Sequence, residues 1–335
     1  MLTVGLDVHQ KTSTVCILDE NGRHVKTWTL AGRWPKLMAK LAKIPRPWQV
    51  CFEATCGYGY LHRQLSRMAE RVVMAHPGQL RLIFRSKRKS DRVDAKKLAT
   101  LLYLDQVPAA HVPPAEVQEW RQLIEWRRRL VDRQTMSKNS IRSLLRTHGV
   151  IAPRRLWSRK GLAWLAAAEL PSETARLRRD MLLEQLAATK SQVTRVTRVL
   201  DRIGQRHPGV LVLTTIPGVG LRTAETIVAY VDDAKRFGRG SQVAAYFGII
   251  PCQDASAGTN RLGHITRQGP PTARKYLVQA TWQGVRRSAA IRAYFERIGR
   301  GQKPRRKIAL VATAHYVLRC MFAMLRTGEA WREAA

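Results

Sequence analysis

Acidic residues are scarce in this chain of 335 residues: 24 Asp and Glu compare with 59 Lys and Arg, for a formal net charge of +35. A chain with such an excess of one sign repels itself, which favours an extended anionic partner. A basic surface that only kept the protein in solution would need far less charge. The composition therefore predicts a protein that binds nucleic acid.

Cysteine is also rare, with five residues, scattered along the chain and without a Cys-x-x-Cys pair. This argues against a disulfide framework or a thiolate zinc site and fits a reducing cytoplasm. Cys16 and Cys51 lie in apolar runs, where we expect core positions. The N-terminus lacks a signal-peptide pattern, and we expect no apolar run near the roughly 20 residues of a membrane-spanning helix. A membrane partner is therefore not expected.

Residues 1–110 alternate between strand and helix patterns. The Asn21-Gly22 pair between two β-rich runs is typical of a hairpin. The resulting order is three strands, then three helices that alternate with two further strands, so the unit is predicted as α/β with a partly parallel sheet. The strands are expected at 2–8, 13–19, 24–30, 48–54 and 71–77, and the helices at 34–44, 59–70 and 90–104.

Residues 111–205 are predicted to form a helical linker arm from two long amphipathic helices, at 117–149 and 175–204. In the second helix, apolar residues repeat at the spacing of a coiled-coil seam, and an ordinary helical bundle is the alternative. The seam residues are Val193, Val196, Leu200 and Ile203.

Residues 206–335 are predicted to be a mainly helical third domain, with a loop over 252–271 and helices at 272–287 and 305–325. The stretch "IPGVG" followed by a helix is typical of a helix-hairpin-helix motif. There Gly218 and Gly220 would let backbone N–H groups approach a phosphate. A plain helix–turn–helix connection is the alternative.

Four acids form the most informative constellation of the first domain. Asp7 lies inside the first expected strand among apolar residues, and Glu53 lies in the strand 48–54. A strand carboxylate with apolar neighbours is costly to bury unless it is paired. Because the first strand should be central with the crossover strand beside it, these two side chains can meet. Asp91 and Asp94, spaced i,i+3, share one face of the following helix.

Carboxylates that converge repel one another, by roughly 4 kcal/mol for a pair about 4 Å apart at an effective dielectric of about 20. A hard divalent cation removes this repulsion. We therefore predict that the four acids hold Mg²⁺, with Mn²⁺ as a substitute, and that two ions clamp the attacking and leaving oxygens of a phosphoryl transfer.

A simpler alternative exists for the two helix acids. Asp91 could be a first-turn acid after Ser90 as the N-cap, and Asp94 could pair with Lys97 or Arg88. The two aspartates would then simply balance part of the positive charge of the surrounding basic residues. On the metal reading the same run holds phosphates, through Arg85, Lys87, Arg88, Lys89 and Arg92.

The loop "DASAGTNRLGHITRQG" is a candidate for nucleophilic chemistry. The Ser256 hydroxyl needs activation by a base or a metal to act as a nucleophile. Arg261, His264 and Arg267 could hold a phosphate beside it and stabilise developing charge. From the residues alone, a Gly-rich turn that contacts a DNA backbone is the favoured alternative.

The motifs "VGLDVHQKTSTVCILDENGR", "FEATCGYG", "KSDRVDAKKLA", "IPGVG", "FGIIP" and "SAGTNRLGHITRQG" together resemble the insertion-sequence transposases with a DEDD tetrad. The resemblance covers nearly the whole chain. It implies an RNase H or RuvC-like N-terminal domain and a C-terminal transposase domain with a catalytic serine, here Ser256, which would form a phosphoserine link to DNA. The tetrad would be Asp7, Glu53, Asp91 and Asp94.

The resemblance further implies a bridge RNA as guide, DNA as substrate, a homo-oligomer between dimer and tetramer joined across the arm, and a bacterial cytoplasm with the nucleoid as the place of action. The family often has a serine pair followed by two glycines where this loop reads Ala255-Ser256-Ala257-Gly258. Two other readings stay open: a metal-dependent nuclease or junction resolvase that uses water, and a non-catalytic nucleic-acid scaffold.

Overall fold

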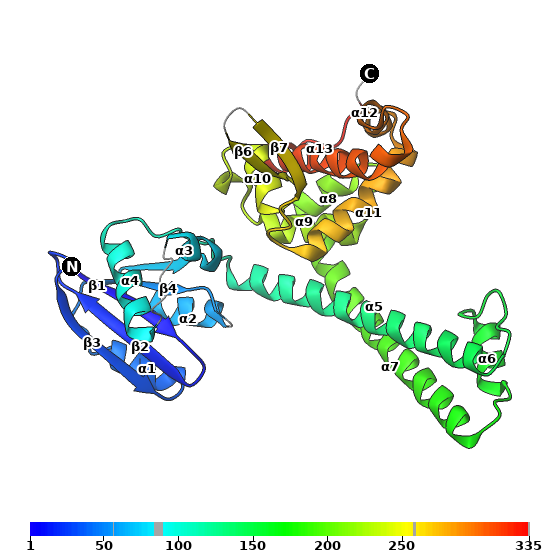
Figure 1. Cartoon of the computed structure of the whole chain (residues 1–335), viewed down its shortest axis with the longest axis horizontal. Helices are drawn as coiled ribbons and strands as arrows, with labels where there is room; N and C mark the ends of the chain where they lie inside the picture. Colours follow the sequence, from blue (N-terminus) through cyan, green and yellow to red (C-terminus); the bar gives the residue numbers. More distant parts are fainter. Residues whose placement is uncertain (56, 84–89, 257–258, 334–335) are drawn as a thin grey trace. The chain divides into compact units, whose positions relative to one another are not determined.

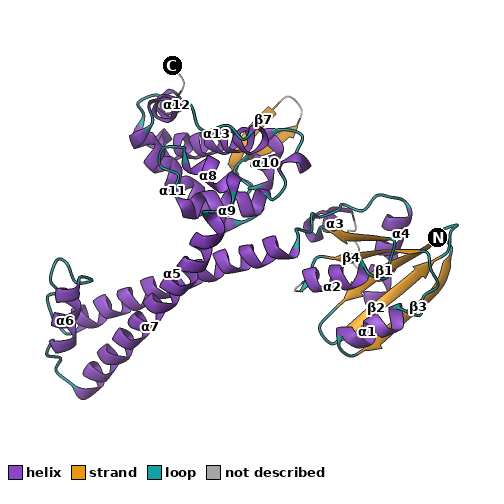
Figure 2. Cartoon of the chain, turned by 180° about the vertical axis from the view of Figure 1, so that it is seen from behind, coloured by secondary structure: helices purple, strands orange, loops and turns teal. Residues whose placement is uncertain are grey.

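A computed structural model of the chain describes residues 1–55, 57–83, 90–256 and 259–333 (Figure 1). The chain divides into two compact units, residues 1–118 and 119–335. Helices predominate in the second unit, whereas the first has a sheet with helices (Figure 2).

The first unit is built on a five-stranded mixed sheet with the order β3-β2-β1-β4-β5. The first three strands form an antiparallel meander, and β4 and β5 continue the sheet in parallel beside β1. The first strand is therefore central with the crossover strand beside it, as the sequence predicted. The bounds are β1 (Leu2–Val8), β2 (Thr12–Leu18), β3 (His24–Ala31), β4 (Trp48–Glu53) and β5 (Arg71–Ala75).

Helices cover both faces of this sheet. Strand residues alternate between the two sides, so each face presents apolar side chains to the helices that cover it. Val4 and Leu6 pack in one cluster with Leu37 of α1 (Trp34–Leu41) and Leu61 of α2 (Tyr58–Leu65). On the opposite face, Cys51 and Cys16 pack with α4 (Asp91–Tyr103). Both cysteines are fully buried, which confirms the expected core positions. A short helix that the sequence did not predict, α3 (Pro77–Ile83), follows β5.

Gly5 of β1 is the point where α4 comes closest to the sheet. A Cβ at this position would lie 2.1 Å from the carbonyl oxygen of Ala95 and 2.5 Å from the backbone nitrogen of Ala99. Only a residue without a side chain therefore lets the helix lie directly on the strand. The mixed sheet with α4 on one face is consistent with the RNase H-like domain expected from the resemblance.

The arm expected in the middle of the chain contains α5 (Ala115–Thr147) and α7 (Glu173–Gly204), with α6 (Arg159–Ala167) at their far end (Figures 1 and 2). A small core that includes Ile141, Leu165 and Leu186 closes this end. Of the four expected seam residues only Leu200 is buried, and it packs in the C-terminal core. Val193 and Val196 are half-buried and Ile203 is exposed. A coiled-coil seam therefore stays a prediction.

The rest of the second unit is a helical domain with one hairpin. Its core joins all of its α-helices with the near ends of α5 and α7. The expected loop over 252–271 was wrong in part, because most of it forms the antiparallel hairpin of β6 (Pro251–Ser256) and β7 (Thr259–Ile265). The helices are α8 (Pro208–Thr214), α9 (Leu221–Val231), α10 (Gly240–Tyr246), α11 (Pro271–Arg287), α12 (Ala289–Gly299) and α13 (Arg306–Thr327). The described part of the unit also has short 3₁₀ turns at Ala234–Arg236 and Lys303–Arg305.

One segment contradicts the expectation that no apolar run approaches the length of a membrane span. Residues 303–327, which include α13, are long and apolar enough to cross a bilayer by length and composition alone. Packing inside the unit explains this composition: Ala314, Val317, Leu318 and Met321 of α13 are at most 1% exposed in the core.

A partly buried charge network links α7 to α9 in the second unit. Glu225 is 1% exposed; its Oε1 lies 3.1 Å from Nη1 of Arg222, and Oε2 has no hydrogen-bond partner among the described residues. Arg222 also pairs with Asp201 of α7. Burial raises the pKa of Glu225 from 4.5 to about 7, although Arg222 and Arg127 oppose this rise. Glu225 is thus an acid whose charged form destabilises the fold.

The contact at Gly5 predicts a loss of stability for Gly5→Ala. The new methyl group would collide with helix backbone, so we expect the first unit to lose about 1–3 kcal/mol of unfolding free energy. Gly78→Ala in α3 is the matched control, since its nearest neighbour is the movable ring of His76 at 3.1 Å. Thermal and denaturant unfolding of both variants measures the difference. Equal stability would contradict the close approach.

Glu225 predicts a pH dependence for the stability of the second unit. Its pKa is higher in the folded state than in the unfolded chain, so the folded state binds more protons between pH 4.5 and about 7. Stability should therefore fall as pH rises through this window, by up to about 3 kcal/mol. Glu225→Gln should flatten the profile, whereas the exposed Glu184→Gln should not. Unfolding curves at several pH values test this, and an unchanged profile in Glu225→Gln would contradict it.

Candidate metal centre and nucleic-acid interface

Two of the predicted acids lie at the carboxyl ends of neighbouring parallel strands. The register pairs Gly5 with Cys51 and Leu6 with Phe52, which puts Asp7 beside Glu53 one step further on. Because side chains alternate, Asp7 shares a face with Gly5 and Glu53 shares a face with Cys51. This is the face that α4 covers.

The other two acids lie in the first turn of α4. Ser90 caps this helix, with its Oγ accepting a hydrogen bond from the backbone N–H of Val93. The cap fixes where the helix starts and so holds Asp91 and Asp94 next to the sheet. Since α4 contacts β1 closely at Gly5, the two acids are held near the end of that strand.

Three side chains of this region come within ligand distance of one another. Oxygen atoms of Asp7 and Asp91 and a ring nitrogen of His9 all lie within 4.8 Å of each other. His9 Nε2 is 3.4 Å from Asp7 Oδ1 and 3.9 Å from Asp91 Oδ1. Of the four predicted acids, Asp7 and Asp91 meet directly, and Asp94 acts on Asp7 through its charge. Glu53 is placed near them by the register of the sheet, and it is not one of the three residues that come within ligand distance.

The protonation of Asp7 reflects this crowding. Only 14% of its side chain is exposed, and burial raises its pKa. The charges of Asp91 and Asp94 raise it further, while His9 lowers it. The cluster thus holds more negative charge than its surroundings compensate. Carboxylate oxygens in this number are the donors that Mg²⁺ and Mn²⁺ prefer, so the residues fit a divalent cation.

The local pairing that the sequence left open as an alternative is present in part. Lys97 Nζ donates to Asp94 Oδ1 at 3.3 Å, and Asp91 follows the capping Ser90. Asp91 nevertheless also approaches Asp7 and His9, which a purely local role does not require. Arg88, the other partner considered for Asp94, lies outside the described residues.

His9 was not among the predicted site residues. It follows Asp7 by two positions, and this spacing puts side chains on the same face of an extended chain. The signal was therefore present in "LDVHQ", but the contact with Asp91 needs the placement of α4, which the sequence alone does not give.

Of the five basic residues expected to hold phosphates in this segment, the structure describes Arg92. Arg92 is exposed in the first turn of α4, next to the acids. The remaining members of the run, Arg85, Lys87, Arg88 and Lys89, lie outside the described residues.

The backbone of Ser256 ends β6 opposite Thr259, and its side chain is not described. Arg261 lies opposite Asp254 in the same hairpin. The register shifts between the pairs Gln253–Leu262 and Pro251–Ile265, so β7 has one extra residue over the stretch that contains His264, and strand alternation does not separate His264 from Arg261. Both are exposed, as is Arg267, which follows the hairpin. Arg261 and His264 thus lie on one strand of the hairpin, and Arg267 lies just beyond its base.

Glycines fix the base of this hairpin. A Cβ on Gly248 would lie 2.0 Å from the carbonyl oxygen of Gln268, and one on Gly269 would lie 1.9 Å from that of Tyr246. Arg274 adds a clamp, since its Nη1 donates to the carbonyl oxygens of Gln268 and Gly269. The close backbone contact explains the glycines of "FGII" and "RQG" and holds the hairpin on the helical core.

The segment predicted as a helix-hairpin-helix folds as α8, a turn and α9, which fits that motif and a plain helix–turn–helix connection equally. Gly218 has φ +92° and packs against α11, where a Cβ would lie 2.4 Å from the backbone nitrogen of Gly284. Packing therefore already explains Gly218. Gly220 caps α9 and faces open space, so its backbone is accessible. A phosphate contact at this turn stays a prediction.

Two family models match the chain. Residues 4–149 match a transposase model of the DEDD type named after IS110, and residues 211–296 match the model of the transposase IS116/IS110/IS902 family. The first match contains all four predicted acids, and the second contains the turn at Gly218 and the hairpin with Ser256.

Relatives that match over most of their length carry transposase names. The transposase for insertion sequence element IS1111A of Coxiella burnetii is 25% identical over 98% of this chain and 91% of its own length. The Sinorhizobium fredii protein y4pF/y4sB, named as a transposase, is 27% identical over 89% and 78% of the two chains. A Pseudomonas aeruginosa protein named as a family 20 transposase is 26% identical over 85% and 86%.

The acidic cluster predicts a divalent metal site that depends on Asp7. Wild-type protein should gain thermal stability on addition of Mn²⁺, and Asp7→Asn should weaken Mn²⁺ binding by at least about tenfold because a charged oxygen ligand is lost. His9→Ala should weaken it as well if the imidazole is a ligand. The exposed Glu20→Gln is the control. Calorimetric titration measures the affinities, and wild-type affinity in Asp7→Asn would contradict the site.

Proposed function

The chain belongs to the DEDD-type insertion-sequence transposases of the IS110 group, and from this premise we propose that it cuts and rejoins DNA strands with a Mg²⁺-bound acidic centre and a serine nucleophile. The observation that carries the proposal is the acidic cluster of Asp7, Asp91 and His9 in a chain with a net charge of +35. Such a chain attracts DNA, and the cluster marks the place where a cation can meet a phosphate.

The proposed metal ligands are Asp7, Glu53, Asp91 and Asp94, and His9 is added from the geometry. A bound divalent cation would supply Lewis-acid polarisation of the scissile phosphate. The residues of this chain prepare the position: Gly5 lets α4 approach, Ser90 starts the helix, and Lys97 holds Asp94. Arg92, exposed beside them, is proposed to hold a neighbouring phosphate of the DNA backbone.

The proposed chemical step involves Ser256. Its hydroxyl gives up a proton as its oxygen forms a bond to phosphorus, and one phosphodiester P–O bond breaks. The deoxyribose oxygen that leaves takes up a proton, so the step exchanges one phosphodiester for another without hydrolysis. The reverse reaction with a different strand then rejoins DNA. Arg261, His264 and Arg267 are proposed to bind the flanking backbone, from strand β7 of the hairpin and from its base.

Other parts of the proposal rest on the resemblance. They are a bridge RNA as guide, a dimer or tetramer as the active form, and action at the bacterial nucleoid. We also retain the proposed division into a RuvC-like domain (1–110), an arm (111–205) and a transposase domain (206–335). The near ends of the arm helices share the core of the C-terminal domain, so those two parts are expected to fold together.

The serine step predicts a covalent protein–DNA species that depends on Ser256. With DNA that carries the ends of the element, the wild type should give a species that survives denaturing gel electrophoresis, and Ser256→Ala should lose it. Ser241→Ala, an exposed serine on α10, is the control. If Ser256→Ala still cuts DNA without a covalent species, the chain is a nuclease or resolvase that uses water. If neither Asp7→Asn nor Ser256→Ala changes DNA cleavage, both assignments are wrong.

A further inference from the structure

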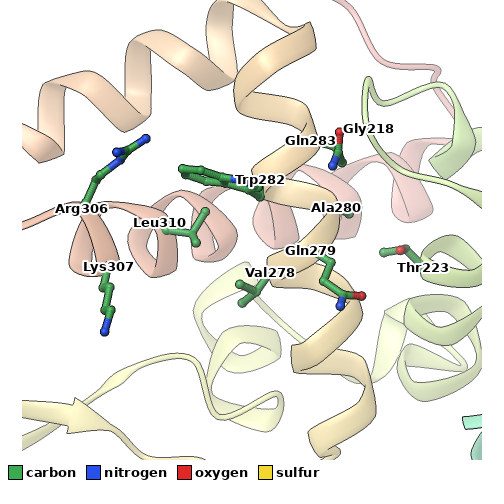
Figure 3. Close-up of a pocket in the computed structure, with 10 residues that line it drawn as sticks. All are labelled: Gly218, Thr223, Val278, Gln279, Ala280, Trp282, Gln283, Arg306, Lys307 and Leu310. Atoms are coloured by element: carbon green, nitrogen blue, oxygen red, sulfur yellow. The ribbon is translucent and has the colours of Figure 1, made fainter. Parts of the chain in front are cut away.

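A groove in the second unit lies outside the acidic centre and outside the serine hairpin. It has a volume of about 710 Å³ and lies along α11, between the turn at Gly218 and the first turns of α13 (Figure 3). A groove of this size is within the range of small-ligand sites. Its walls bring together three kinds of side chain that are useful for one class of ligand.

The wall of the groove is apolar and aromatic along α11 and α13. Val278 and Trp282 are one helical turn apart on α11, and Leu310 of α13 lies near Trp282 (Figure 3). The Trp282 ring is half-buried and is anchored edge-on against Phe295, with 6.0 Å between ring centroids. The guanidinium of Arg286 lies 5.6 Å from the centre of the same ring, so the indole is held in place and only part of its surface is accessible.

Hydrogen-bonding groups follow the same helix. Gln279 and Gln283, also one turn apart, are exposed amides at the groove, and each offers both donors and an acceptor. Amide side chains of this kind pair with the polar edges of nucleobases. They add directional contacts beside the apolar wall.

Positive charge gathers at the other end of the groove. Arg306 and Lys307 form the first turn of α13, and the guanidinium of Arg306 lies 5.3 Å from the centre of the Trp282 ring. Cations at a helix N-terminus oppose the helix dipole, so a bound anion would relieve an unfavourable arrangement. None of the residues that line the groove, all of them described, is acidic.

We propose that this groove binds an unpaired nucleotide of a single-stranded nucleic acid, with the base on Trp282 and the adjoining phosphate at Arg306 and Lys307. A base in a duplex has both faces stacked and its pairing edge occupied, so it cannot offer them to the indole and the two amides. Gly218 helps to shape the site, since its contact with the backbone of α11 fixes the turn at the end of the groove. The inference rests on the proposed function only in taking nucleic acid as the substrate.

The test uses the full-length protein and a labelled hexanucleotide, as single-stranded DNA, as single-stranded RNA and as paired duplex. Trp282→Leu should weaken single-strand binding by about tenfold, since base–aromatic stacking contributes on this scale. Arg306→Gln with Lys307→Gln should weaken it and should reduce the slope of log affinity against log salt by about 1.4. The exposed pair Arg198→Gln with Arg202→Gln removes the same charge elsewhere and should change neither quantity. Anisotropy gives the affinities.

A second measurement keeps the test independent of folding defects in Trp282→Leu. Photocrosslinking of a halogenated uracil in the wild-type protein, mapped by mass spectrometry, should mark the peptide with Trp282. Tighter binding of RNA would identify a guide strand, and tighter binding of DNA a displaced strand. Crosslinks that map elsewhere, wild-type binding in the Arg306 and Lys307 variant, or duplex binding with the same dependence would overturn the proposal. The test measures binding and crosslinking of the hexanucleotide and involves no cleavage, so failure of the cleavage chemistry remains distinguishable.

Discussion

The contact between α4 and Gly5 is the constraint on which the acidic centre depends. Because Gly5 lacks a side chain, the backbone at Ala95 and Ala99 lies directly on the central strand. The helix therefore brings its first turn, with Asp91 and Asp94, to the end of the strand that carries Asp7. A larger residue at position 5 would push α4 outward and separate the acids, even though it lies two residues from the nearest of them.

This packing concentrates negative charge in a chain that has little of it. With 24 acidic residues against 59 basic ones, most acids could be neutralised by a neighbouring Lys or Arg. Asp7 instead has two acids and a histidine around it, and burial and these acids raise its pKa. A DNA phosphate attracted by the basic surface would be repelled at this point. A divalent cation reverses the sign of the interaction, which makes metal binding and phosphate binding at the cluster depend on each other.

The sequence predicted the sheet well because its information is local there. The strand patterns, the Asn21-Gly22 turn and Ser90 as an N-cap each depend on a few adjacent residues, and the order of parallel strands follows from crossover geometry. Contacts between residues that are distant in the sequence were harder to predict. The approach of His9 to Asp91 needs α4 in place, and the hairpin over 251–265 looked like a loop because its Gly-rich sequence lacks a clear strand pattern. Hydropathy also could not separate α13 from a membrane span, because length and apolar composition are the same for both, and only the tertiary packing of α13 distinguishes it.

Gly218 is the clearest case where one sequence pattern fits two physical roles. "PGVG" before a helix is read as a phosphate-binding turn, yet Gly218 packs against the backbone of α11. The packing role does not remove the turn from nucleic-acid binding, because it fixes one end of the groove that contains Trp282. On the proposed function, strands are exchanged between duplexes, and nucleotides are unpaired during that exchange. Stacking on an indole stabilises them without regard to sequence, since every base has an aromatic face. A transposase that took sequence information from a guide could therefore use such a groove at many different targets.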